Sequence, residues 1–172
     1  MTSIELNEES KVELGSLVSQ VRSTAMPNEL PISTHFIGLE DVIPHEGRIL
    51  NSSYTSEVKS RVFLFSSGDV LYGRLRPYLS KVALVDFDGA ASAEFIVLRC
   101  SEKILPRYLL MILLSEDFTG FISARVKGDR PRTSFATVSS YKVELPSIEV
   151  QADICARDIV LAGAMEKLNE AI

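Results

Sequence analysis

The sequence predicts an α/β fold of the α+β kind, in which helices flank a twisted, mostly antiparallel sheet and a helix of coiled-coil character ends the chain. One observation is a group of β-branched segments separated by turn residues. Another is that the long helical patterns lie after residue 105. A third is the apolar content of 46% over 172 residues, which suffices for one substantial core. The expected central strands are Val70–Tyr72, Ser80–Phe87 and Glu94–Cys100.

The N-terminal part is predicted to be helical at first. Thr2–Glu13 is polar, and we expect it to be frayed or loosely helical. The following segment, Val12–Arg22, has helical spacing of its apolar residues Leu14, Leu17, Val18 and Val21. Pro27 and Pro31 then mark a connector.

The middle of the chain is predicted to be mostly strand and turn. His35–Leu39 resembles a strand, and Val58–Phe65 alternates partly before a turn at 66–69. The first two central strands flank a basic loop, and the chain returns to the third through small residues.

The C-terminal part is predicted to be mainly helical. Pro106 suits the first turn of a helix that runs to Ile122. The loop Lys127–Ser134 ends it, and a short strand lies within Val138–Leu145. Ser147 is a suitable N-cap for a final helix over 148–172.

The final helix carries a heptad pattern. Its apolar positions recur every seven residues, with further apolar residues four positions later, at Ile154, Leu161, Met165, Leu168 and Ile172. The equivalent early positions, Gln151 and Asp158, are polar. The pattern therefore leaves two interpretations, in which the helix packs on its own domain or pairs with another helix.

Charge is distributed unevenly along the chain. Residues 70–132 contain ten basic and seven acidic residues, a net charge of +3, whereas the remainder has a net charge of −8. An acidic protein with one basic region is suited to selective rather than general binding of nucleic acid.

The sequence contains few features of an enzyme. Glycine-rich nucleotide loops, the GxSxG and HExxH motifs and the amino-methyltransferase motif are absent. Two histidines and two isolated cysteines give no metal-ligand pattern. We find no apolar run long enough for a membrane span and no secretory signal, so we expect a cytoplasmic, non-catalytic protein with reduced thiols and no membrane partner.

Two basic loops are the candidate binding residues. The first loop holds Arg74, Arg76, Tyr78 and Lys81 around Pro77. The second loop adds four basic side chains and a hydroxyl, at Arg125, Lys127, Arg130, Arg132 and Ser134. Arginine can hydrogen-bond guanine O6 and N7, while lysine and hydroxyl side chains can hold phosphate. The alternative for each arginine is an ion pair with a local acid such as Asp86, Asp88 or Asp129, or, for Arg76 and Arg132, contacts with backbone carbonyls.

These residues lie in segments that resemble a known family. The segments GDVLYGRLRPYLSKVAL, SAEFIVLR, LPRYLLMILLSEDF and GDRPRTSFATVSSYKVELPSIEVQADI are similar, in this order, to the target recognition domain of type I restriction-modification specificity subunits. The upstream FIGLEDVIPHEGRI resembles the opening of that domain. The likeness extends from about Val12 to about Ile159. One departure is the helix entry LPSIEVQ, where the family usually has two prolines and a glutamate before the glutamine.

The resemblance implies a non-catalytic DNA-specificity component that binds one half of a bipartite site in double-stranded DNA. It implies a target recognition domain over 1–146 and a spacer or dimerisation helix over 147–172. The implied partners are a type I methyltransferase subunit, which carries S-adenosylmethionine, a restriction (motor) subunit, and a second copy of the chain through its helix. No cofactor is expected in this chain.

The shared scaffold of the family, Pro77, Tyr78 and Leu79, need not contain the residues that contact bases. We therefore also consider the loops at 127–134 and 52–61 for that role. Two alternatives stay open: an interaction or assembly module that does not bind DNA, and the specificity segment of a single-chain restriction–methyltransferase. The chain is interpreted as a half-size subunit, half of a longer protein or a fragment.

Overall fold

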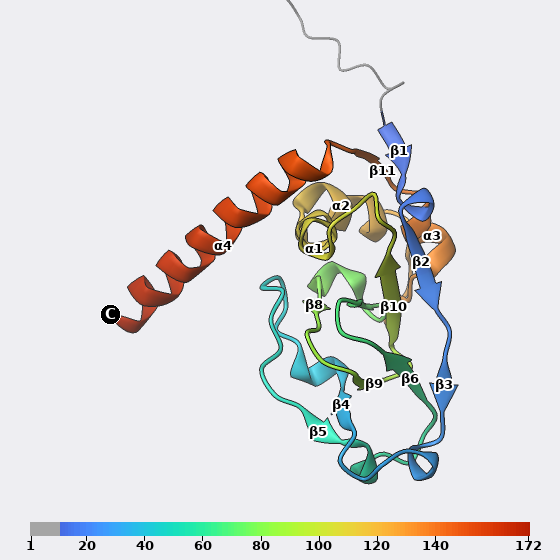
Figure 1. The fold of residues 1–172 in the computed structure, drawn as a ribbon. Helices are drawn as coiled ribbons and strands as arrows, with labels where there is room; N and C mark the ends of the chain where they lie inside the picture. The colour runs from blue at the N-terminus through green and yellow to red at the C-terminus, as the bar shows by residue number, and fades with distance from the viewer. Residues whose placement is uncertain (1–10) are drawn as a thin grey trace, which may run out of the picture.

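The computed structural model describes residues 11–172 (Figure 1), so the helical expectation for Thr2–Ser10 lies outside the described residues. Its strands form three sheets, a small one with the order β1-β11, a four-stranded one with the order β2-β10-β7-β8 and a five-stranded one with the order β3-β6-β9-β4-β5. Every strand pair is antiparallel except β4–β9, which confirms the predicted mixed, mostly antiparallel architecture. The strands are β1 (Lys11–Glu13), β2 (Val18–Val21), β3 (Thr24–Ala25), β4 (His35–Ile37), β5 (Ser53–Tyr54), β6 (Val62–Phe65), β7 (Val70–Gly73), β8 (Val82–Leu84), β9 (Gly89–Ala91), β10 (Phe95–Cys100) and β11 (Lys142–Glu144).

The three predicted central strands are confirmed as β7, β8 and β10. β7 lies between the other two, with Leu71 opposite Val97 on one side and Ala83 on the other. Leu71, Val97 and Ala83 are almost completely buried. The β-branched runs therefore form three adjacent strands of the four-stranded sheet, with β8 at its edge.

The prediction of a helix over Val12–Arg22 is wrong. Lys11–Glu13 pairs with β11, a single 3₁₀ turn follows, and Val18–Val21 pairs with β10 along its whole length. The apolar spacing of this segment fits a helix, but the same residues can be buried equally well in a 3₁₀ turn followed by a strand. Pairing with β10 decides the outcome, because strand preference depends on tertiary context.

The small-residue return between β8 and β10 contains a strand that the sequence analysis missed. β9 (Gly89–Ala91) is buried throughout and lies between β6 and β4. A Cβ atom at Gly89 would lie 2.8 Å from the Phe65 ring and 2.9 Å from the His35 carbonyl oxygen. Small side chains therefore allow the close approach of these strands, although they carry little strand propensity of their own.

The helix predicted from Pro106 to Ile122 is two helices, α1 (Pro106–Leu114) and α2 (Glu116–Ser123). Ser115 between them is extended, and its hydroxyl caps α2 by accepting a hydrogen bond from Phe118 N at 3.2 Å. A short helix, α3 (Phe135–Ser139), precedes β11. Figure 1 shows α1 and α2 at the end of the body from which the last helix leaves.

The core has two main parts. One joins the four-stranded sheet to the helices and includes Tyr72, Leu109 and Phe118. The other joins the two larger sheets and includes Phe65 and Leu71. In residues 11–172, no helix is long and apolar enough to cross a membrane.

The last helix, α4 (Ile148–Glu170), begins with the predicted cap, because Ser147 Oγ accepts a hydrogen bond from Val150 N at 3.3 Å. Its early polar positions contact the domain: Gln151 is completely buried, and Asp158 pairs with Arg107 at 2.7 Å. Ile154 is partly buried. The first half of α4 therefore packs on its own domain. The later part extends away from the body (Figure 1) but keeps an ion pair between Glu166 and Arg48 at 2.9 Å.

The apolar residues in the later part of α4 are exposed to solvent. Leu161, Met165 and Leu168 are 65%, 65% and 63% exposed, and Ile172 beyond the helix end is 99% exposed. At about 100° per residue these positions form a stripe about a sixth of a turn from the side that carries Gln151 and Asp158. The coiled-coil character predicted for this stripe stays a prediction.

Candidate nucleic-acid interface

The two predicted basic loops meet in the folded chain. Arg76 N donates a hydrogen bond to Pro131 O at 2.8 Å, and Thr133 N donates one to Arg74 O at 2.9 Å. Leu75 and Arg132 form an isolated antiparallel bridge between these bonds. Segments more than fifty residues apart thus form one continuous surface, which we call the basic face and define by residues 74–78, 94 and 130–133.

The first loop is held in an uncommon backbone conformation. Arg76 has φ 49° and ψ 62°, in the left-handed region, and precedes a 3₁₀ turn over Pro77–Leu79. Leu79 N donates to Arg76 O at 2.9 Å, and Pro77 is buried while Tyr78 is 45% exposed. A non-glycine residue in this region costs about 1–2 kcal/mol, and such conformations gather at functional sites.

Glu94 lies at the centre of the basic face. Arg74 N donates to the Glu94 carbonyl oxygen at 2.8 Å, because Gly73 and Phe95 are paired in neighbouring strands. The Glu94 carboxylate accepts hydrogen bonds from Arg132 Nη2 at 2.7 Å and from Arg132 Nε at 3.1 Å. The hydrogen bond from Arg132 lowers the pKa of Glu94, and the charges of Arg132, Arg74 and Arg130 act in the same direction.

Two buried polar atoms at this junction have no hydrogen-bond partner within residues 11–172. They are Arg74 Nε and Thr133 Oγ1, and Thr133 is only 3% exposed. Their residues are joined by the backbone bond between Thr133 N and Arg74 O. Buried polar groups are normally paired, so unpaired ones mark a position where a polar ligand or water can bind.

The other predicted residues differ in how far their polar groups are engaged. Lys81 Nζ donates to Leu39 O at 2.7 Å, and the Arg125 guanidinium lies 3.6 Å from the Phe121 ring centroid while bonding Phe121 O. Ser134 caps α3 by accepting from Thr137 N at 3.4 Å. Lys127 and Arg130 are exposed. The fold thus brings four arginines together, Arg74, Arg76, Arg130 and Arg132. The polar groups of Lys81, Arg125 and Ser134 are instead bonded to other parts of the fold.

The loop at 52–61 belongs to the other sheet. Its strand β5 pairs with β4, at the far end of the body from α4 in Figure 1. Within residues 11–172, its backbone makes no hydrogen bond to the basic face, and Arg61 donates to Thr24 Oγ1 at 3.4 Å. A role in base contact for this loop stays a prediction separate from the basic face.

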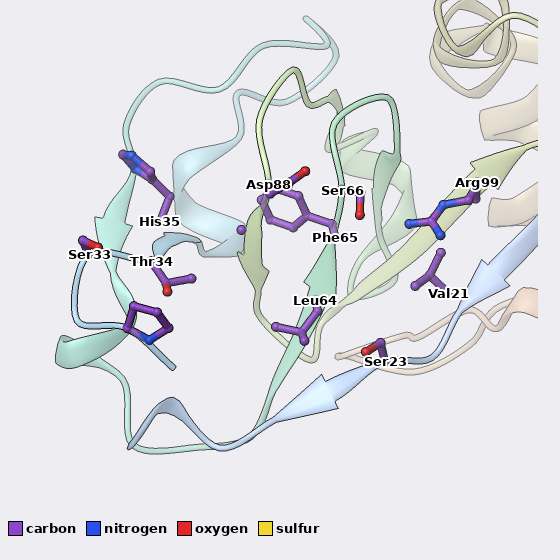
Figure 2. Close-up of a pocket in the computed structure, with 12 residues that line it drawn as sticks. Val21, Ser23, Ser33, Thr34, His35, Leu64, Phe65, Ser66, Asp88 and Arg99 are labelled. Carbon is purple, nitrogen blue, oxygen red and sulfur yellow. The ribbon is translucent and has the colours of Figure 1, made fainter. Parts of the chain in front are cut away.

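A cleft of about 570 Å³ lies between the two larger sheets, and Figure 2 shows His35 and Asp88 on one side of it and Arg99 on the other. Arg99 is held by the buried Asp69 through two bonds of 2.8 Å. None of the sequence-predicted binding residues lines this cleft. Within residues 11–172, no cluster of three or more His, Cys, Asp or Glu side chains is arranged to hold a metal ion.

Glu94 is a member of the site that was not predicted from the sequence. The expected acidic partners of the arginines were Asp86, Asp88 and Asp129, all close in sequence, but Arg132 pairs with an acid 38 residues away. The only sequence signal is an acid just before a buried strand. The prediction that Arg132 could form an ion pair is thus correct. Its partner was not predicted, because the position of Glu94 depends on strand register.

Fold and surface together define a mixed α+β domain with an arginine-rich face suited to DNA. Residues 29–157 match the family model of the type I restriction modification DNA specificity domain. Because this match covers most of the 172 residues, the chain belongs to that family, and the resemblance seen in the sequence is confirmed.

Individual relatives agree with this assignment. The chain is 31% identical over 94 residues to the type I restriction enzyme EcoDI specificity subunit of Escherichia coli, and 32% identical over 94 residues to the HindI specificity subunit of Haemophilus influenzae. These alignments cover 54% and 51% of this chain but only 21% and 20% of the relatives. The relatives are named as specificity subunits, which confirms the expectation that this chain belongs with the specificity component.

Solved structures show the same fold. The crystal structure of the HsdS subunit from Thermoanaerobacter tengcongensis matches with a TM-score of 0.77 and 26% identity, over 94% of this chain and 43% of that chain. A structure from work on complex assembly and conformational transition of the type I R-M system matches with a TM-score of 0.79 and 24% identity, over 94% and 44%. The chain thus spans under half the length of either solved chain.

Proposed function

We propose that this chain binds one half of a bipartite site in double-stranded DNA through the basic face and docks type I methyltransferase subunits. The observation that carries the proposal is the joining of two basic loops into one surface by the bonds Arg76 N to Pro131 O and Thr133 N to Arg74 O. Membership of the DNA specificity family supports it. In this proposal the chain supplies specificity, while the partner subunits supply catalysis and S-adenosylmethionine.

The charge distribution fits a local contact with DNA. The net charge of −5 disfavours general attraction to phosphate, so binding depends on a restricted surface. Arg76 and Arg130 are exposed at the edges of the basic face, and Tyr78 is available beside them. Exposed guanidinium groups on two converging loops can bond several phosphates while other side chains enter a groove.

The second proposed surface is the apolar stripe of α4, formed by Leu161, Met165, Leu168 and Ile172. Solvent-exposed apolar side chains in a row indicate an interaction surface. In the proposal this stripe pairs with a matching helix, either in a second copy of the chain or in a second half of a longer subunit. The restriction (motor) subunit would join the resulting complex, which acts in the cytoplasm where its DNA substrate lies.

Salt-dependent DNA binding tests the first part of the proposal. The fluorescence anisotropy of a labelled pool of random duplex DNA is measured with the whole chain, alone and with its methyltransferase, over a series of salt concentrations. Affinity should fall steeply with salt, because each phosphate that the protein neutralises contributes about −0.9 to the slope of log affinity against log salt. The double variant Arg74→Glu, Arg76→Glu should bind at least tenfold more weakly.

Arg157→Glu is the matched control, because Arg157 is exposed on α4 and its ion pair is with Asp153 of the same helix. It reverses one charge outside the basic face and should change DNA affinity little. Unchanged DNA retention by the Arg74→Glu, Arg76→Glu complex would contradict the assignment of this face. A stable methyltransferase complex without any DNA binding would instead favour an assembly module.

A further inference from the structure

The Arg132–Glu94 pair has a definite geometry. Arg132 uses Nε and Nη2, the two donors along one side of its guanidinium, to bond the Glu94 carboxylate at 3.1 and 2.7 Å. A guanidinium carries five N–H donors in a planar fork. The end-on edge, with one N–H from Nη1 and one from Nη2, is not used by Glu94.

This free edge is held in place from two directions. Glu94 fixes the plane of the guanidinium, and the Leu75–Arg132 bridge fixes the backbone of Arg132 against the first loop. The Arg132 side chain is still 42% exposed, so the free edge can reach a ligand. A pre-oriented arginine loses less side-chain entropy when it binds than a free arginine does.

We infer that Glu94 is a positioning residue that presents the Nη1–Nη2 edge of Arg132 to the O6 and N7 atoms of one guanine in the major groove. The inference rests on the proposed function. Two parallel N–H donors match the two parallel acceptors of that guanine edge, which is the commonest base-specific arginine contact.

The alternative ligand of Arg132 is a backbone phosphate, and the charges of the site argue against it. The Glu94 carboxylate neutralises much of the Arg132 charge and repels a phosphate anion. A guanine edge is uncharged overall, so its binding depends on the direction of the N–H donors more than on net charge. Within residues 11–172, Arg74, Arg76 and Arg130 have no carboxylate within ion-pair distance, which suits them better to phosphate.

Selection of bound sequences tests this assignment. Duplex DNA of random sequence is incubated with the wild-type chain assembled with its methyltransferase, and the bound fraction is sequenced to obtain the base preference at each position. The same selection is repeated with Arg132→Lys, which keeps the charge but has no fork, and with Glu94→Gln, which keeps an acceptor but removes the negative charge. Arg157→Gln is the control, because it removes an exposed arginine with a carboxylate partner away from the basic face.

The expected result is loss of preference at a single guanine. Arg132→Lys should lower the discrimination at that position by about tenfold or more, because one bidentate pair supplies discrimination of this size. Glu94→Gln should raise affinity for non-specific DNA, since it removes a negative charge, but should lower discrimination at the same guanine. These opposite changes distinguish positioning from a merely structural or repulsive role. Arg157→Gln should leave the preference unchanged.

Other results would overturn the inference in distinguishable ways. Equal weakening of all sequences by Arg132→Lys would make Arg132 a phosphate contact, with DNA binding itself intact. Unchanged guanine preference in Glu94→Gln would remove Glu94 from the positioning role. Absence of salt-dependent DNA binding by the wild-type complex would instead be a failure of the proposed function. Thermal melting of each variant checks that the fold is retained.

Discussion

The side chain of Gln151, in the first turn of α4, accepts a hydrogen bond from the backbone N of Leu105 at 2.9 Å. Its amide nitrogen also donates to Lys103 O and Pro146 O, each at 3.0 Å. Gln151 is completely buried, so all of its polar groups depend on these bonds. One side chain thus joins the last helix, the segment before α1 and the segment after β11.

Gln151→Leu should destabilise the protein by about 3 kcal/mol, because it leaves a buried N–H and two buried carbonyl groups without this partner. For a chain of this length the melting temperature should fall by about 10 °C. Calorimetry measures the overall loss, and hydrogen exchange at the Leu105 amide measures the local one. The control Asp153→Asn changes an exposed neighbour and should cost under about 0.5 kcal/mol. Unaltered exchange at Leu105 would contradict the anchoring role.

Arg76→Gly should separate stability from DNA binding. Glycine adopts the left-handed conformation of Arg76 without strain, which offsets its larger entropy in the unfolded chain. We expect urea unfolding to show a change within about 1 kcal/mol, together with weaker DNA binding. Arg76→Val removes the same charge but should cost about 2 kcal/mol, since a β-branched residue is strained there. Equal stability of the Gly and Val variants would rule out backbone strain at this position.

The predictable parts of the fold are those set by local sequence. The central strands are recognisable because each combines β-branched residues with flanking turns, and the cap at Ser147 follows from residue type. β9 was missed because Gly89 and the two alanines after it contain no local strand signal. Val18–Val21 was misassigned because its pairing partner, β10, lies about eighty residues away.

The site was predictable as two loops but not as one surface. Each loop is visible as a cluster of basic residues between turn formers. Their junction depends on the Leu75–Arg132 bridge, and no local pattern encodes it. The role of Glu94 follows from the register that pairs Gly73 with Phe95, so the acid nearest in space is distant in sequence.

The two cysteines should react slowly with alkylating agents while the protein is folded. Burial, together with the charge of Asp69, raises the pKa of Cys100 from 9.0 to about 12, and burial raises the pKa of Cys155. Near pH 8 both thiols are therefore protonated, and the thiolate is the reactive form. Iodoacetamide labelling followed by mass spectrometry should show slow modification that becomes fast in denaturant. Rapid labelling of the folded protein would contradict the raised pKa values.

Cys100 also predicts a pH dependence of stability. The folded pKa of about 12 exceeds the ordinary value of 9.0, so the unfolded chain loses this proton first as the pH rises. The contribution of the neutral thiol is fully present below pH 9.0 and decreases as the pH rises from 9.0 towards 12. Urea unfolding of Cys100→Ala should therefore show a shallower fall in stability over this range than the wild type. Parallel curves would contradict the assignment to Cys100.

The apolar stripe of α4 should mediate association without supporting the fold of the domain. Leu161 and Leu168 are 65% and 63% exposed, so the double variant Leu161→Lys, Leu168→Lys should change the free energy of unfolding by about 1 kcal/mol or less. If both leucines are buried by a partner helix, their loss should weaken association by about 3 kcal/mol or more, equivalent to at least a hundredfold in Kd. Sedimentation equilibrium measures self-association, and co-purification with the methyltransferase measures docking. Lys167→Gln changes an exposed residue of the same helix turn and should leave both unchanged. A double variant that still self-associates and co-purifies like the wild type would show that the stripe is not the contact surface, and the partner would then have to bind elsewhere on the domain.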